Sequence, residues 1–197
     1  MRNLILQEFV SVDGMAAGPM GSVDFIPAAT SGDQSFGRRQ SAFLDAIDAI
    51  LLGRITYEMF AGYWPKVTSG DEKEFADKLN AIPKVVFSKS LDRAPWGDWP
   101  AATIVKSNAA REIARLKQQP GREMVIWGSI SLAQSLINEG MIDEYQLIVC
   151  PVVLAEGRRL FDEYVAAGEM HLVSTRSFDR GAVLLSYSGA MAAAGVR

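Results

Sequence analysis

Apolar residues occur along this chain in short unbroken runs, and most of these runs are followed by an amphipathic stretch. The runs predict strands at residues 3–12, 49–52, 84–88, 103–106, 123–127 and 143–154. Apolar positions three or four residues apart predict helices at 36–48, 56–62, 71–80, 108–117 and 132–138. Two alternating segments, 171–178 and 182–188, are joined by Asp179-Arg180-Gly181, which is typical of a β-hairpin.

The order of strand followed by helix predicts an α/β fold. Because most strands are apolar without alternation, both faces of the sheet are expected to be covered by helices. We therefore expect a three-layer α/β/α sandwich whose sheet has about eight strands, mostly parallel, with an antiparallel hairpin at its C-terminal end. Residues 64–72 are the only linker-like stretch and are too short to divide the chain, so residues 1–190 should form a single domain, with a frayed tail at 191–197.

Composition narrows the class of protein. The 197 residues are 49% hydrophobic and 22% charged, with a net charge of −3, which favours a globular protein over a nucleic-acid-binding one. No apolar run approaches the ~18 residues of a membrane span, and no secretory signal is evident. Cys150 is the only cysteine and lies in an apolar run, so we expect a buried thiol and a cytoplasmic protein. No residues have the spacing of metal ligands, and no nucleophile–base pair is suggested.

Three turns between a strand and a helix carry polar or basic residues: Gly53-Arg54-Ile55-Thr56, Ser88-Lys89-Ser90 and Gly128-Ser129-Ile130-Ser131. Ligands of open α/β sheets bind beyond the carboxyl ends of the strands, where helix N-termini suit phosphate. Each turn alone is better explained as an ordinary turn with helix capping, and only the three together make an anion site an even alternative. Neither G-x-G-x-x-G nor a P-loop motif is present to fix the cofactor.

Five stretches carry a resemblance to a known family: "SVDGMAAG", "LLGRITYEMFAGYWP", "KVVFSKSL", "VIWGSISLAQSL" and "IDEYQLIVCPVVLAEGRRLF". Together they make the chain resemble the dihydrofolate reductase-like fold, and more closely the C-terminal reductase domain of bifunctional riboflavin-biosynthesis deaminase-reductases. The second and fifth stretches are the specific ones. The chain departs from the family at Ser129 and Ala155, where related chains usually have glycine.

The resemblance implies that NADPH binds along the strand ends. Arg54 would face the 2′-phosphate of the adenosine, Thr56 the pyrophosphate, and Ala16 the nicotinamide ring. The full set of implied cofactor-binding residues is Ala16, Gly53, Arg54, Thr56, Ser88, Lys89, Gly128, Ser129, Ile130, Ser131 and Leu132. The substrate would be lined by Gln7, Phe9, Phe60, Trp64 and Trp127, although core packing is an alternative role for each aromatic side chain.

Folate reductases hold a carboxylate on their first long helix, and the matching stretch here, residues 35–38, has no acid. We therefore assign no catalytic acid; Asp13 is expected to be a turn residue and His171 a surface residue. Arg38 and Arg39 could bind an anionic substrate, and a solvated helix face explains them equally well.

The resemblance implies an NADPH-dependent reductase that transfers hydride to a small pteridine-like, pyrimidine-like or carbonyl-like substrate. Two alternatives stay open: a pyrimidine reductase of riboflavin biosynthesis, and a module that binds NADPH without turnover. A homodimer is also expected, because the segment 145–154 and the final hairpin are apolar enough to need cover and closed dimers are the commonest oligomers.

Overall fold

The computed structural model describes residues 1–165 and 167–189, so the predicted frayed tail, 191–197, lies outside the described residues. Its main sheet has eight strands in the order β5-β4-β3-β6-β1-β7-β10-β9. These are β1 (Leu4–Ser11), β3 (Ile47–Gly53), β4 (Lys84–Phe87), β5 (Thr103–Val105), β6 (Glu123–Trp127), β7 (Glu144–Cys150), β9 (His171–Ser177) and β10 (Val183–Ser188). Within this sheet, the antiparallel pairings described are those of β10, with β7 on one side and β9 on the other. The predicted mixed sheet with its C-terminal hairpin is confirmed.

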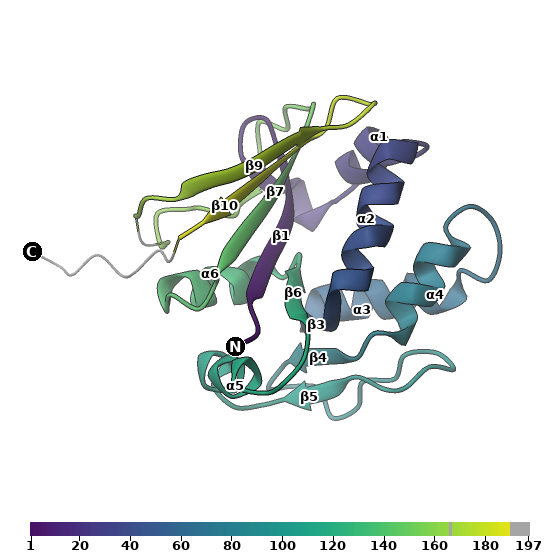
Figure 1. Cartoon of the computed structure of the whole chain (residues 1–197), viewed down its shortest axis with the longest axis vertical. Coiled ribbons are helices and arrows are strands. Elements are labelled where there is room, and N and C mark those ends of the chain that lie inside the picture. The colour runs from purple at the N-terminus through teal and green to yellow at the C-terminus, as the bar shows by residue number, and fades with distance from the viewer. Residues whose placement is uncertain (166, 190–197) are drawn as a thin grey trace, which may run out of the picture.

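Helices cover both faces of this sheet, and Figure 1 shows the two groups on opposite sides of it. On one side lie α1 (Phe25–Thr30), α2 (Gln34–Ala46), α3 (Arg54–Tyr63) and α4 (Lys73–Ala81). On the other lie α5 (Ala109–Lys117) and α6 (Ile130–Asn138). Two short 3₁₀ helices, η1 (Pro19–Gly21) and η2 (Trp64–Lys66), connect elements.

The two faces of β1 show how the sequence builds two cores. Leu4 and Leu6 point into a cluster with the apolar faces of α5 and α6, whereas Ile5, between them, packs in a second cluster with α2, α3 and α4. Side chains alternate between the faces of a strand, so a continuous apolar run is what a doubly covered strand requires. All three side chains are at most 1% exposed.

The structure corrects one strand prediction. The strand expected over 143–154 ends at Cys150, since the next residue, Pro151, has no N–H to donate to a ladder. Cys150 itself is fully buried, as predicted, and burial raises the pKa of its thiol to about 11. The residues that follow form a loop leading to Ala155, whose φ of 63° is left-handed and explains why glycine suits this position.

The loop predicted after Asp13 contains more structure than its composition suggests. Residues Met15–Ala17 form β2, which pairs antiparallel with β8 (Arg158–Arg159), and η1 and α1 follow. The pairing joins segments about 140 residues apart in the sequence, which periodicity cannot reveal. Among the described residues, no helix combines the length and the apolar character that crossing a bilayer would require.

Candidate functional site

A cleft of about 1960 Å³ opens at the carboxyl ends of β1, β3 and β6. The ladder between β1 and β6 stops at the pair Gln7–Trp127, whereas the ladder between β1 and β7 continues to Ser11–Cys150. In the main sheet, β3 lies on one side of β1 and β7 on the other. The chain goes from β1 to β3 in one direction across the sheet, and later goes from β6 to β7 in the opposite direction. Such a reversal of strand order is where open α/β sheets bind their ligands.

Two of the three predicted turns are locked together across the floor of the cleft. The N–H of Gly53 donates to Oγ of Ser129 at 2.8 Å, and the N–H of Ser129 donates to Oγ1 of Thr56 at 2.9 Å. Gly128, with φ of 52°, passes so close to Thr56 that an added Cβ would lie 3.2 Å from its side chain. Ser129 is also left-handed, with φ of 59°, and its hydroxyl donates to the carbonyl of Trp127. The resulting floor is rigid and made of small residues.

The N-terminus of α6 opens into the same cleft. The N–H groups of Leu132 and Ala133 bond back to the carbonyl of Ser129, while those of Ile130 and Ser131 precede any acceptor within the helix. Both residues line the cleft. Because these N–H groups have no acceptor within the helix and lie at the positive end of its dipole, this turn is suited to a phosphate group.

A residue that sequence reasoning missed, Arg158, adds a positive charge at this turn. Its Nη2 donates to Oγ of Ser131 at 3.0 Å, and it lines the cleft. The short strand β8 holds it there by pairing with β2. The close approach of these two strands requires glycine at position 157, because a Cβ there would lie 2.0 Å from the carbonyl oxygen of Ala17. The sequence signal was the pair of arginines directly after Gly157.

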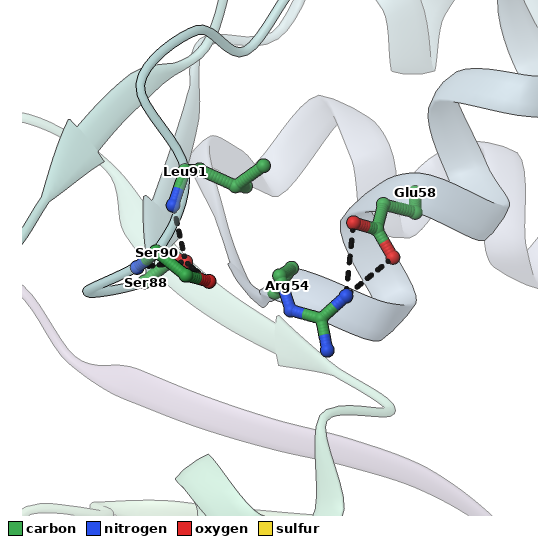
Figure 2. Close-up of polar contacts among 5 residues, drawn as sticks. All are labelled: Arg54, Glu58, Ser88, Ser90 and Leu91. Atoms are coloured by element: carbon green, nitrogen blue, oxygen red, sulfur yellow. Dashed lines mark hydrogen bonds and ion pairs between the residues drawn. The ribbon is translucent and has the colours of Figure 1, made fainter.

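Arg54 begins α3 at the rim of the cleft and is already paired (Figure 2). Its Nη1 lies 3.0 Å from both carboxylate oxygens of Glu58, one turn along the helix. Ser88 closes its own turn, since its hydroxyl accepts from the N–H groups of Ser90 and Leu91. An anion at Arg54 would therefore compete with an exposed ion pair.

The structure separates Ser88 and Lys89 from the other predicted cofactor residues. They line a separate hollow of about 280 Å³, one strand farther out, together with Phe87, which lines both. The remaining predicted residues do line the large cleft: Ala16, Gly53, Arg54, Thr56, Gly128, Ser129, Ile130, Ser131 and Leu132.

All five predicted substrate residues also line the cleft: Gln7, Phe9, Phe60, Trp64 and Trp127. The rings form a chain, with Phe60 centred 6.2 Å from Trp127 and 6.3 Å from Trp64. The amide of Gln7 is engaged on both sides. Its oxygen accepts from Trp127 at 2.8 Å and from Gln40 at 2.9 Å, and its nitrogen donates to Gln146. Gln7 thus fixes the orientation of the indole.

The two arginines near the start of α2 differ in position. Arg38 lines the cleft and is exposed. The guanidinium of Arg39 instead lies over the ring of Phe43, 5.2 Å from its centroid. Only Arg38 is therefore placed to meet a ligand in the cleft.

The loop that carries Ala16 is tied down by Asp13. Its carboxylate accepts hydrogen bonds from the Ser11 hydroxyl at 2.6 Å and from the N–H groups of Leu154 and Ala155. These bonds, the one from Ser11 foremost, lower the pKa of Asp13 to about 2. The predicted turn role of Asp13 thus extends to joining two distant loops, and Ala16 is held 3% exposed at the cleft wall.

The second residue that sequence reasoning missed is Glu8, which lies between Gln7 and Phe9 on β1 and lines the cleft. Its side chain is 4% exposed, and burial raises its pKa to about 8. Oε1 accepts from the N–H of Phe9 at 3.1 Å, and Oε2 has no hydrogen-bond partner among the described residues. An acid in the middle of a mostly apolar strand was the signal, because a buried carboxyl is costly unless it has a role.

The cleft therefore has an end rich in N–H groups and arginines and an end walled by aromatic rings. This combination suits a ligand with phosphates at one end and a planar ring at the other. Within residues 1–165 and 167–189, no three His, Cys, Asp or Glu side chains gather in a way that could hold a metal ion.

Comparison with known proteins agrees with this architecture. A family model described as the RibD C-terminal domain matches residues 2–184. The uncharacterized protein YyaP of Bacillus subtilis (strain 168) is 33% identical over 187 residues, which cover 94% of each chain.

Solved structures share the fold at lower identity. A putative riboflavin biosynthesis protein from Shewanella sp. PV-4 superimposes with a TM-score of 0.72 and 21% identity, over 95% of this chain and 98% of that one. A dihydrofolate reductase from Enterococcus faecalis, solved as a complex with NADP(H), superimposes with a TM-score of 0.61 and 16% identity, over 94% of this chain and 95% of that one.

Proposed function

The chain belongs to the family of RibD C-terminal domains, and we propose that it is a reductase that uses NADPH to transfer hydride to a small heterocyclic or carbonyl-like substrate. The family supports an oxidoreductase, and the shared fold with a dihydrofolate reductase solved with NADP(H) supports a nicotinamide cofactor. No protein nucleophile is needed, because the bound cofactor supplies the hydride and the protein orients it.

The observation that carries this proposal is the phosphate-ready turn at the N-terminus of α6. Gly128 brings the backbone close to Thr56, and the N–H groups of Ile130 and Ser131 lack acceptors within the helix. Arg158 adds a guanidinium beside Ser131. A pyrophosphate bound here would receive backbone hydrogen bonds and a charge-assisted bond together, which fits the middle of a dinucleotide.

The proposed positions of the two ends of the dinucleotide follow from the pyrophosphate site at the N-terminus of α6. Arg54, at the rim, would take the 2′-phosphate in exchange for Glu58, with Ser88 and Lys89 farther along the adenosine side. At the other end, Ala16 would cover the nicotinamide ring in the proposed complex. Its loop is held by Asp13, so the wall against which the ring packs is formed before the cofactor binds.

The substrate class follows from the aromatic end of the cleft. Phe9, Phe60 and Trp127 offer flat apolar surfaces, which suit a planar heterocycle. Gln7 holds the indole of Trp127 in one orientation. Arg38 would meet an anionic substituent on such a substrate.

The direct test is NADPH oxidation, followed by absorbance, over a panel of pterins, ribosylamino-pyrimidines and small ketones. We expect at least one member to be reduced. Gly128→Ala should abolish this oxidation, because its Cβ would press on Thr56 at the cofactor turn. Gly62→Ala is the matched control: it lies on α3, and a Cβ there meets nothing within 4 Å. Binding of NADPH without oxidation of any compound would contradict a reductase and favour a cofactor-binding module.

A further inference from the structure

Glu8 lies on the face of β1 that turns toward α6. It is flanked on the strand by Leu6 and Val10, which pack in one cluster with Ala16 and Ile130. Gln7 and Phe9 point the other way, toward Gln40 and Phe36 of α2. The acid is therefore separated from the aromatic substrate wall and shares its side of the sheet with the proposed cofactor turn.

Glu8 is the first residue of β1 beyond the ladder with β6. Beyond the pair Gln7–Trp127, β1 has no ladder partner on that side, and Oε1 of Glu8 takes the N–H of Phe9. Oε2 has no partner among the described residues. Burying a carboxylate without a counter-charge is costly, so the group is held here as a neutral acid at neutral pH.

No charged neighbour explains this state of Glu8. Burial alone raises its pKa, and only the N–H of Phe9 acts against it. Titratable groups lie on the neighbouring elements, and none of them is among the causes of the shift: Glu123 on β6, Glu144, Tyr145 and Cys150 on β7, and Arg158 and Arg159 on β8. The carboxyl thus lies in a poorly solvated place without a counter-charge, on a residue that lines the cleft.

A neutral carboxyl presents one donor and one acceptor side by side, and a primary carboxamide presents the complementary pair. We propose that Glu8 binds the carboxamide of the nicotinamide ring as a neutral acid, and releases its proton to solvent when the oxidised, positively charged ring lies in the cleft. This inference rests on the proposed NADPH site. No bond of the cofactor forms or breaks in the step; only the Glu8 O–H dissociates.

The charge of the nicotinamide ring decides whether Glu8 keeps its proton. The reduced ring is uncharged, so it leaves the buried acid neutral. The oxidised ring brings a positive charge into a site where charges interact more strongly than in water, and an opposite charge favours the ionised carboxylate. Glu8 would therefore couple its protonation to the oxidation state of the bound cofactor, and higher pH would favour NADP⁺ over NADPH by up to about tenfold per pH unit.

Calorimetric titration near pH 7, in two buffers of different ionisation enthalpy, measures the protons released on binding. We expect wild type to release close to one proton more with NADP⁺ than with NADPH. The 2′-phosphate is common to both ligands, so the difference isolates the ring. Glu8→Gln keeps a donor and an acceptor in the same place and should abolish the difference. Binding of 2′,5′-ADP, which has no nicotinamide, should be the same in both proteins.

Each contrary result is distinct. Equal proton release for NADP⁺ and NADPH in wild type would overturn the inference and leave the cofactor site standing. A difference in proton release between NADP⁺ and NADPH that persists in Glu8→Gln would have the same consequence. If wild type binds none of the three ligands, the proposed function itself fails. The wild-type comparison needs no variant, so it stands even if Glu8→Gln folds poorly.

Discussion

Replacing Arg54 with alanine should weaken NADPH binding by about 5- to 70-fold and leave NADH binding nearly unchanged. The two cofactors differ by the 2′-phosphate alone. Arg54 stands at the first position of α3, on the rim of the cleft, with its side chain 45% exposed. A guanidinium there can take a phosphate with two parallel hydrogen bonds.

The expected loss of NADPH affinity is the free energy of the contact between Arg54 and the phosphate, less that of the ion pair with Glu58 that Arg54 gives up. A hydrogen bond to a charged group is worth about 1.5–3 kcal/mol net. Against it stands the ion pair with Glu58, in which both carboxylate oxygens lie 3.0 Å from Nη1. An exposed pair of this spacing on a helix is worth about 0.3–0.5 kcal/mol. The difference of about 1–2.5 kcal/mol corresponds to the stated loss, since 1.4 kcal/mol is tenfold in affinity.

Fluorescence titration of each protein with NADPH and NADH, at fixed ionic strength, measures the effect. Glu58→Gln is the matched control and should act in the opposite direction, raising NADPH affinity by about twofold because Arg54 is no longer engaged. Equal weakening of NADPH and NADH in Arg54→Ala would mean that Arg54 supports the turn. No loss for either cofactor would refute the site.

Four further predictions follow from the same structure. Dihydrofolate should be reduced far below the roughly 1–10³ s⁻¹ of a dedicated enzyme, because α2 has no acid around Gly37; steady-state rates within that range would contradict this. Stability should fall by up to about 4 kcal/mol as pH rises from about 4.5 to 8, since the folded state holds the Glu8 proton that the unfolded chain has lost; denaturant melts across this range should show no such fall for this group in Glu8→Gln. The protein should be a homodimer, because every residue of the edge strand β9 is exposed and Leu172 and Val173 are more than half exposed; a monomer mass by light scattering at micromolar concentration would exclude this. Ala155→Gly should stabilise the fold by about 0.5–1 kcal/mol by relieving its left-handed backbone, and an unchanged melting temperature would argue against strain there.

Most of the sheet could be predicted because its strands are apolar on both faces and its helices keep one apolar stripe. The predictions failed where a single residue or a distant pairing decides the structure. Pro151 ends β7 early, and β2 forms only because β8 arrives from the far end of the chain. A short strand with one partner has no periodicity that the sequence could display.

The candidate site was accessible from sequence where glycine and small residues mark a turn. Gly53 and Gly128 marked two turns that the structure then joins by hydrogen bonds, and the resemblance supplied the roles proposed for the residues around them. Glu8 was missed because an acid in a strand looks like a solvated edge until its burial is known. The pairing of Arg54 with Glu58 was missed because the helix starts two residues earlier than predicted, which puts these two side chains on one face.

A crystal structure of the protein with NADPH would show whether the cleft is the cofactor site. We expect the pyrophosphate against the N–H groups of Ile130 and Ser131, with the 2′-phosphate beside Arg54 and the nicotinamide ring between Ala16 and Trp127. A cofactor bound outside the cleft, or a cleft that stays empty at saturating NADPH, would contradict it.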